Sequence, residues 1–152
     1  MAEALYTSAI IPSVTYMNKE ISGNIVELTL NDLDNCTAFW DIPSKLEEPI
    51  RSGEKKAFAY KTGDSFVGGC ALSIQADCGH FSYFSVTPNF RGKGIGSCII
   101  DFAEKYFQEM KVSKMRLHVD KDNSAAIRLY ERNGFVYERE VTPERIAMIK
   151  II

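Results

Sequence analysis

Long hydrophobic runs are missing from this 152-residue sequence. Even the longest apolar stretches, such as Ile95–Ile100, are short, whereas a membrane-spanning helix needs about 20 consecutive apolar residues. The first basic residue is Lys19, and the apolar stretch Ala9–Ile11 ends at Pro12, so the N-terminal segment does not have the pattern of a secretory signal peptide. These absences predict a protein of the cytoplasm that does not associate with a membrane.

Cysteine and histidine are scarce, and neither sign of charge dominates. There is no Cys-x-x-Cys pair among the four cysteines, and His80 and His118 do not have zinc-finger spacing, so we expect buried, reduced thiols and no metal. The formal net charge is −2, which argues against an extended binding surface for nucleic acid or anionic lipid. A small basic site is still compatible with this balance.

Hydrophobic periodicity predicts a mixed α/β fold. We expect strands over residues 25–30, 56–60, 66–74, 80–86, 115–119, 135–139 and 145–152. We expect helices from an Asn31-Asp32 cap to about Trp40, from Pro43 to about Ile50, over 95–110, and over 124–132. The strands first pair as hairpins and then alternate with helices, which favours a mixed sheet with helices on its faces.

The domain organisation follows from the absence of repeats and linkers. Residues 23–152 are expected to form a single domain, as the chain length also suggests. Residues 1–22 show no clear periodicity, so we expect an irregular N-terminal arm or an added edge element.

Glycine is concentrated where a predicted strand leads into the strongest predicted helix, in the segment Arg91-Gly92-Lys93-Gly94-Ile95-Gly96-Ser97. Glycines let the backbone approach a ligand closely, and the first amides of a helix, together with its dipole, attract anions. Arg91 and Lys93 add positive charge, so the loop is suited to a diphosphate. A Walker loop would need glycine at Thr87, and a dinucleotide-binding fingerprint would need glycine at Ser97, so neither motif is present.

The segment resembles the Arg/Gln-x-x-Gly-x-Gly/Ala signature of the GNAT superfamily of acetyl-CoA-dependent acyltransferases. A second segment supports the resemblance, because that family's Asn-x-x-Ala-x-x-Leu-Tyr-x-x-x-Gly-Phe pattern is matched by Asn123, Ala126, Leu129, Tyr130, Gly134 and Phe135. The resemblance implies a mixed, mostly antiparallel central sheet with a splayed strand pair and helices on both faces. It also implies acetyl transfer from acetyl-CoA, as co-substrate and without a metal, to a small-molecule or peptide amine. We expect a monomer or a homodimer.

The resemblance further implies which residues bind CoA. The pyrophosphate would contact Arg91, Gly92, Lys93, Gly94, Ile95, Gly96 and Ser97, mostly through backbone amides. The rest of the cofactor would contact Phe84, Ser85, Val86, Asn123, Ala126 and Tyr130. The strand at residues 115–119 is the expected splayed partner of the strand that carries Phe84. Asn123 can also act as a helix cap, and the two roles are compatible.

The same resemblance implies the catalytic groups. Tyr130 would protonate the departing CoA thiolate, although a tyrosine at helical spacing can also be a core residue. His80 stands where a histone-acetyltransferase-like branch of the family has a glutamate base, so it is the candidate base; a solvent-facing histidine and proton transfer through ordered water are the alternatives. The Val86 N–H could stabilise the developing oxyanion. Cys98 lies on the apolar face of the long helix, which favours an inert thiol over a nucleophile.

The sequence leaves two other functions open. One is a CoA-binding module without catalytic activity, and the other is a nucleotide-dependent oxidoreductase, which the incomplete dinucleotide fingerprint disfavours. The family places acceptor selectivity in its first two helices, here about residues 31–51. Phe39 and Trp40 are possible walls of an acceptor pocket there.

Overall fold

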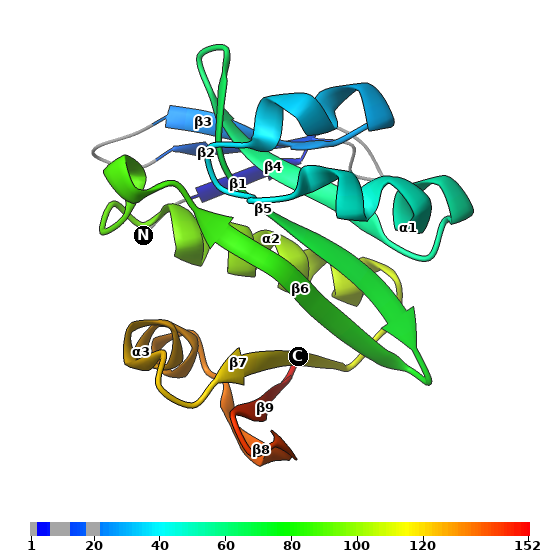
Figure 1. Ribbon diagram of the computed structural model, residues 1–152, viewed down its shortest axis with the longest axis vertical. Coiled ribbons are helices and arrows are strands. Elements are labelled where there is room, and N and C mark those ends of the chain that lie inside the picture. Colours follow the sequence, from blue (N-terminus) through cyan, green and yellow to red (C-terminus); the bar gives the residue numbers. More distant parts are fainter. Residues whose placement is uncertain (1–2, 7–12, 18–21) are drawn as a thin grey trace.

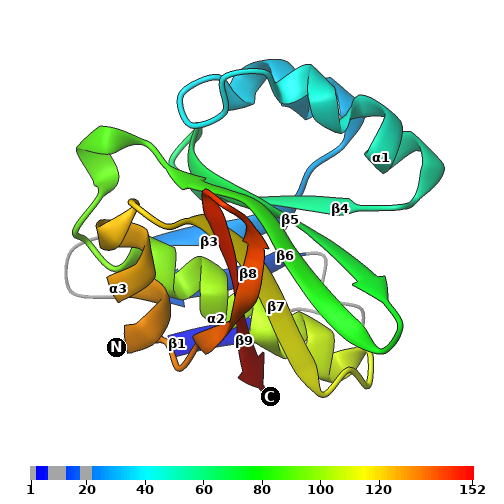
Figure 2. The ribbon, with the colours of Figure 1, turned by 60° about the horizontal axis from the view of Figure 1, so that its bottom comes forward.

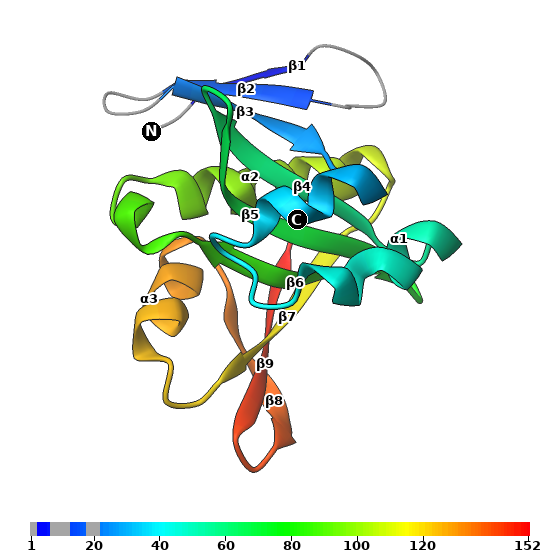
Figure 3. The ribbon, with the colours of Figure 1, turned by 45° about the horizontal axis from the view of Figure 1, so that its top comes forward.

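A mixed sheet organises the chain. The computed structural model describes residues 3–6, 13–17 and 22–152, and their strands form a nine-stranded sheet in the order β1-β2-β3-β4-β5-β6-β7-β9-β8. β1 and β8 lie at its opposite edges (Figure 3). The strands are β1 (Glu3–Tyr6), β2 (Ser13–Met17), β3 (Ser22–Glu27), β4 (Lys56–Thr62), β5 (Ser65–Gln75), β6 (Cys78–Val86), β7 (Lys114–Asp120), β8 (Val136–Thr142) and β9 (Arg145–Ile151).

Helices cover both faces of this sheet. On one face lie the 3-10 helices η1 (Leu30–Cys36) and η2 (Pro43–Leu46) with α1 (Glu47–Ser52). On the other face lies α2 (Ile95–Glu109), with α3 (Ser124–Arg132) beside it (Figure 2). Each face has its own apolar core, because the strand side chains alternate between a cluster under α2 and a smaller cluster under η1 and η2. The expected mixed sheet with helices on both faces is confirmed.

The adjacent strands β6 and β7 form the one parallel pair among the described strands, and they separate soon after they meet. They pair only at Gly79 with Met115 and at His80 with Arg116. Beyond this point the two strands diverge toward Val86 and Asp120 (Figure 1). The expected splayed pair is thereby confirmed, and the backbone groups along its inner edges have no strand partner there.

A β-bulge distorts β6 within the splayed region. The β5–β6 register runs from Gly69 opposite Ser85 to Ala71 opposite Ser82, so β6 has one extra residue. Tyr83 lies in this extra stretch with a φ of 53°, in the left-handed region that non-glycine residues rarely adopt. The bulge bends β6 and so changes the direction of the end that leads to the glycine-rich loop.

The structure corrects two expectations near the N-terminus. Within residues 1–22, Glu3–Tyr6 and Ser13–Met17 are antiparallel strands added to the sheet edge, so an irregular arm is wrong for these segments. The alternative of an added edge element is correct for them. Residues 1–2, 7–12 and 18–21 lie outside the described residues, and a domain boundary at residue 22 stays a prediction.

The second correction concerns the first predicted strand and helix. The strand ends at Glu27 instead of Leu30, and a 3-10 helix over Leu30–Cys36 replaces the predicted helix that reached Trp40. The cause is local: the Asp32 carboxylate accepts hydrogen bonds from the Thr29 N–H (2.7 Å) and the Thr29 hydroxyl (3.0 Å). Thr29 is therefore the N-cap of the 3-10 helix, and its amide is not available for a hydrogen bond to a neighbouring strand.

Candidate functional site

The glycine-rich loop places the start of α2 at the splayed end of β6. Gly92 and Gly94 have φ values of 75° and 86°, which require glycine, and Gly94 caps α2. The Cys98 N–H donates to the Gly94 carbonyl over 3.1 Å, so the amides of Ile95, Gly96 and Ser97 precede the helical ladder. These amides and the positive end of the helix dipole form a site for an anion.

The last residue of β6 presents its amide to the gap between the splayed strands. The Thr87 N–H donates to the Val67 carbonyl over 2.8 Å, which makes these two residues a hydrogen-bonded pair of the β5–β6 ladder. Hydrogen-bonded pairs alternate with non-hydrogen-bonded pairs along an antiparallel ladder. The next pair, Gly68 and Val86, is therefore not hydrogen-bonded, and the Val86 N–H and carbonyl point away from β5. The Arg91 Nε donates to the Val86 carbonyl over 2.8 Å, which leaves the Val86 N–H to meet a ligand.

One cavity of about 540 Å³ brings the predicted CoA-binding residues together. It is lined by Phe84, Ser85, Val86, Phe90, Arg91, Gly92, Gly94, Gly96, Ser97, Asn123, Ala125, Ala126, Leu129, Tyr130 and Arg132. Lys93 and Ile95 are the predicted residues outside this lining. Ile95 is buried in the core, so only its backbone amide could serve a ligand. Arg132 was not predicted; it is an exposed cation on the last turn of α3.

Contacts between α2, α3 and β6 fix the shape of this cavity. The Asn123 side chain accepts a hydrogen bond from the Ala126 N–H over 3.2 Å, so its predicted role as the cap of α3 is confirmed. The Asn133 amide donates to the Ser97 hydroxyl (3.2 Å) and to the Leu129 carbonyl (2.9 Å), which ties the two helices together. A Cβ on Gly96 would lie 3.2 Å from the Leu129 and Phe84 side chains, so this glycine also permits close packing.

Tyr130 lies where two cavities meet. It lines the 540 Å³ cavity and also a cavity of about 220 Å³ between the splayed strands, where His118 and Asp120 of β7 are further lining residues. Its side chain is 6% exposed, and its ring packs near Phe84 (6.0 Å) and Phe135 (5.9 Å). Burial raises the pKa of Tyr130 to about 12, so the phenol keeps its proton at neutral pH. The expected core packing is therefore present, and it leaves the residue in a position to donate a proton.

The two histidines occupy different places in the splayed region. His80 lines a third cavity, of about 480 Å³, which Tyr130 does not line. His118 lines both this cavity and the one that contains Tyr130. Burial lowers the pKa of both imidazoles, and positive neighbours lower it further: Arg116 acts on both, and Arg145 and Arg139 also act on His118. Sequence reasoning missed His118, although its alternation with Leu117 and Val119 places it on the outward face of β7.

Trp40 supports the bulge of β6 from the opposite face of the sheet. Its indole Nε1 donates to the Tyr83 carbonyl over 2.7 Å, and its side chain is 6% exposed. A Cβ on Gly69 would lie 2.8 Å from the Phe39 ring and 3.0 Å from the Trp40 ring, so the adjacent strand must have glycine there. Phe39 and Trp40 also line a cavity of about 580 Å³, as expected for pocket walls. Their contact with an acceptor stays a prediction.

The hydrogen bond from Trp40 leads to a prediction about the bulge. Trp40→Phe keeps an aromatic ring against Gly69 but leaves the Tyr83 carbonyl without its donor. We expect the free energy of unfolding to fall by about 1 kcal/mol, the typical net contribution of one hydrogen bond, because this bond is only partly buried. Urea unfolding measures this change. Phe39→Leu is the control that alters packing alone, and equal unfolding free energies for Trp40→Phe and the unchanged protein would contradict the prediction.

The buried thiols add little chemistry to the site. All four cysteines are buried and unpaired, and burial raises the pKa of Cys98 to about 11, which favours the inert thiol. Within the described ranges no group of three or more His, Cys, Asp or Glu side chains could hold a metal ion. None of the helices in those ranges is both long enough and apolar enough to span a membrane.

Comparisons with curated proteins give partial matches. An uncharacterized N-acetyltransferase of Methanocaldococcus jannaschii is 39% identical over 67 residues, which are 44% of this chain and 29% of that protein. A mycothiol acetyltransferase of Streptomyces coelicolor is 27% identical over 110 residues, which are 72% of this chain and 33% of that protein. The chain thus spans about a third of the length of these curated relatives.

Solved structures resemble this chain over most of its length. Ard1 from Thermoplasma volcanium has a TM-score of 0.75 at 23% identity, over 86% of this chain and 97% of that one. The PaiA N-acetyltransferase from Thermoplasma acidophilum, solved in complex with coenzyme A, has a TM-score of 0.72 at 18% identity, over 84% of this chain and 98% of that one. At these identities the likeness is one of fold. Residues 27–135 match the Acetyltransferase (GNAT) family, and because this match covers most of the chain, the chain belongs to that family.

Proposed function

We propose that this protein transfers an acetyl group from acetyl-CoA to an amine, which attacks the thioester directly. The observation that carries the proposal is the 540 Å³ cavity, which joins the helix amides of the glycine-rich loop to the splayed strands and to Tyr130. Such a cavity suits a ligand with a diphosphate at one end and a thioester at the other. The acceptor is a small molecule or a peptide with a free amino group.

The residues that line the cavity support CoA as its ligand. The amides of Ile95, Gly96 and Ser97 would hold the pyrophosphate, with positive charge from Arg91 and Arg132 nearby. The pantetheine arm would lie along residues 84–86, where the Val86 N–H points into the gap. Asn123 and Ala126 form part of the opposite wall.

The chemistry follows from the groups at the inner end of the cavity. The Val86 N–H would stabilise the negative charge that develops on the thioester oxygen as the amine attacks. Tyr130 would protonate the departing thiolate, which its raised pKa allows because the phenol is fully protonated at neutral pH. The bond to nitrogen forms as the bond to sulfur breaks, and the amine loses one proton to a base or to water.

A neutral imidazole is the group most suited to take that proton. His80 and His118 are the two candidates, and the lowered pKa of each keeps it neutral at pH 7. We favour His118, because it shares a cavity with Tyr130 and His80 does not. The proton would pass to His118 directly or through a water molecule.

Two other functions are less well supported. A CoA-binding module without activity would have no use for a phenol and an imidazole in one cavity beside the thioester position. An oxidoreductase would need a dinucleotide site, and Ser97 stands where the fingerprint requires glycine. Calorimetric titration with acetyl-CoA and with NADH separates the proposal from the second alternative: acetyl-CoA should bind and NADH should not.

Ser97→Asp tests the pyrophosphate site without weakening the helix. An acidic residue in the first turn of a helix is favourable for folding, but here its charge would repel the diphosphate. We expect the Kd for acetyl-CoA to rise at least about 10-fold, since one unit charge close to another is worth this much near a protein surface. Ser97→Asn is the neutral control of the same size and should bind within a few-fold of the unchanged protein. An unaltered Kd for folded Ser97→Asp would place the diphosphate elsewhere.

A further inference from the structure

A third cavity, of about 480 Å³, extends from the splayed strands across the sheet face opposite α2. It shares Ser82, His118 and Arg145 with the smaller cavity that contains Tyr130, so the two cavities adjoin. Its lining includes three cationic side chains and two imidazoles, but no carboxylate. An acceptor whose amine lies beside His118 would therefore extend into a basic surface.

The strand register arranges this basic surface as a row. Ser73 lies opposite His80, and His80 lies beside Arg116 across the β6–β7 pair. Lys56 lies opposite Leu72, so the preceding residue, Lys55, stands next to Ser73 at the end of β4. We call the four residues Lys55, Ser73, His80 and Arg116 the acceptor row; all four line the 480 Å³ cavity.

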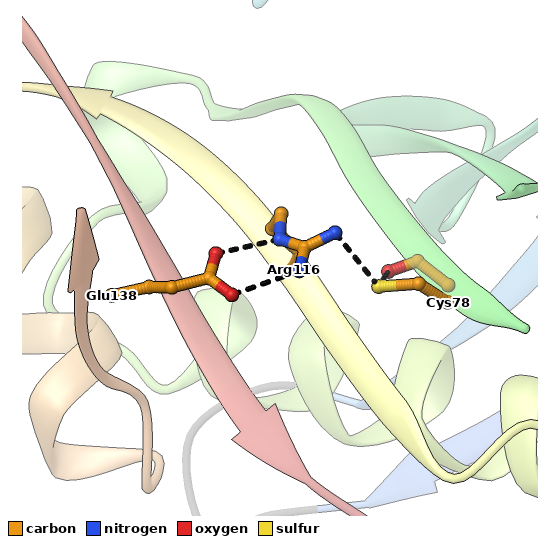
Figure 4. A network of polar contacts seen from close by, with 4 residues as sticks. Cys78, Arg116 and Glu138 are labelled. Atoms are coloured by element: carbon orange, nitrogen blue, oxygen red, sulfur yellow. Dashed lines mark hydrogen bonds and ion pairs between the residues drawn. The ribbon is translucent and has the colours of Figure 1, made fainter. Parts of the chain in front are cut away.

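The charge of the row is only partly neutralised. Arg116 forms a bidentate ion pair with Glu138, with distances of 2.7 and 2.8 Å, and its third nitrogen contacts the Cys78 sulfur at 3.4 Å (Figure 4). Arg145, a further lining residue of the cavity, forms an ion pair with Asp120 through a single contact of 3.3 Å. Lys55 is half-buried, and its ammonium has no hydrogen bond or ion pair with any residue that the structure describes. Lys55 thus gives the cavity an uncompensated positive charge.

Ser73 supplies a second and independent sign of a ligand. Its side chain is 5% exposed, and within the described part of the chain its hydroxyl has no hydrogen-bond partner. Buried polar groups in proteins are nearly always hydrogen-bonded, because an unpaired one costs free energy. A hydroxyl without a partner at the wall of a basic cavity is a ready donor to an anionic ligand.

We propose that the acceptor row binds a carboxylate of the acceptor, so that the enzyme prefers amines that carry one. The inference rests on the proposed acetyl transfer and names the class of its acceptor. Along β7, Arg116 and His118 are two residues apart, or about 7 Å. This separation exceeds that of the amine and carboxylate in an α-amino acid. The carboxylate would therefore be the acidic side chain of a peptide's first residue or the far end of an ω-amino acid.

Matched pairs of acceptors test the inference and distinguish the two possible origins of the carboxylate, a peptide and an ω-amino acid. The peptide pair is Glu-Ala-Ala-amide and Gln-Ala-Ala-amide; the small-molecule pair is 4-aminobutyrate and its amide. For each compound, calorimetry measures binding to the protein with CoA present, and thiol release from acetyl-CoA measures kcat/KM. We expect the carboxylate member of at least one pair to bind about 10-fold more tightly and to have a correspondingly higher kcat/KM, as for one charge-assisted hydrogen bond.

Variants of two adjacent lysines identify the group responsible for the preference for a carboxylate. Lys55→Gln should remove most of the preference while leaving the KM for acetyl-CoA and the binding of neutral acceptors unchanged. Lys56→Gln is the control, because successive strand residues face opposite sides of the sheet. Ser73→Ala should weaken binding of the carboxylate member only. Equal binding within both pairs, or equal effects of the two lysine variants, would overturn the inference. A binding preference without thiol release would count against the proposed function alone.

Discussion

Tyr130→Phe is expected to lower kcat about 10²-fold, the lower end of the range for loss of one general acid. The KM for acetyl-CoA should change little, because in the proposed mechanism the hydroxyl would act on the departing thiolate and not on the bound ground state. The phenylalanine ring keeps the packing against Phe84 and Phe135, so the protein should fold normally. Steady-state kinetics of both proteins, with melting curves to confirm folding, measure the effect.

The pH dependence of this loss separates the chemical role from a structural one. Burial raises the pKa of Tyr130 to about 12, so its phenol stays protonated throughout the range in which the enzyme can be assayed. The ratio of the two kcat values should therefore be constant from pH 6 to about pH 10, two units below that pKa. A loss of stability with an unchanged kcat would show that Tyr130 is a core residue and that water donates the proton.

The second large effect is expected from His118→Asn, which should lower kcat/KM for the amine about 10²-fold at pH 7. Asparagine keeps a polar group of similar size but cannot accept the proton at this pH. His80→Asn is the matched control, since it removes an imidazole from the adjacent strand in a cavity that Tyr130 does not line. Because His80 belongs to the acceptor row, both variants are assayed with an amine that has no carboxylate, and with this acceptor we expect His80→Asn to retain most of the activity.

The acid side of the rate profile gives an independent check on His118. Burial and then the nearby arginines lower the pKa of His118 below the usual 6.5, so its neutral form, which is the proposed base, persists to lower pH. Activity should therefore stay high at pH 6.5 and fall only as the pH drops below that value. In His118→Asn this decline should disappear. A larger loss in His80→Asn than in His118→Asn would assign the base to His80 instead, and small losses in both would leave ordered water in that role.

Features with a local cause could be predicted from the sequence. The glycine-rich loop, the long amphipathic helix after it and the Asn123 cap of α3 each depend on residues within a few positions of one another. The structure has all three close to their predicted positions. The predicted first strand runs three residues too far, to Leu30, because the equally local cap formed by Thr29 and Asp32 ends it at Glu27.

Features that depend on strand register could not be predicted in this way. The hydrogen bond from Trp40 to the Tyr83 carbonyl joins residues 43 positions apart, and it exists because β6 has an extra residue. His118 reaches the cavity of Tyr130 because β7 diverges from β6 only after Arg116. The acceptor row likewise needs the pairing of four strands. A pattern of alternating residues gives the face of each side chain but not its neighbours on the next strand.

The most direct test of the proposed acetyl transfer is a mass balance. The protein is incubated with acetyl-CoA and an amine, and mass spectrometry quantifies free CoA and the N-acetylated amine over time. We predict that the two products form in equal amounts, at a rate that depends on the amine and falls about 10²-fold in Tyr130→Phe. Tight binding of acetyl-CoA with no N-acetylated product from any amine would contradict catalysis and would make the chain a CoA-binding module.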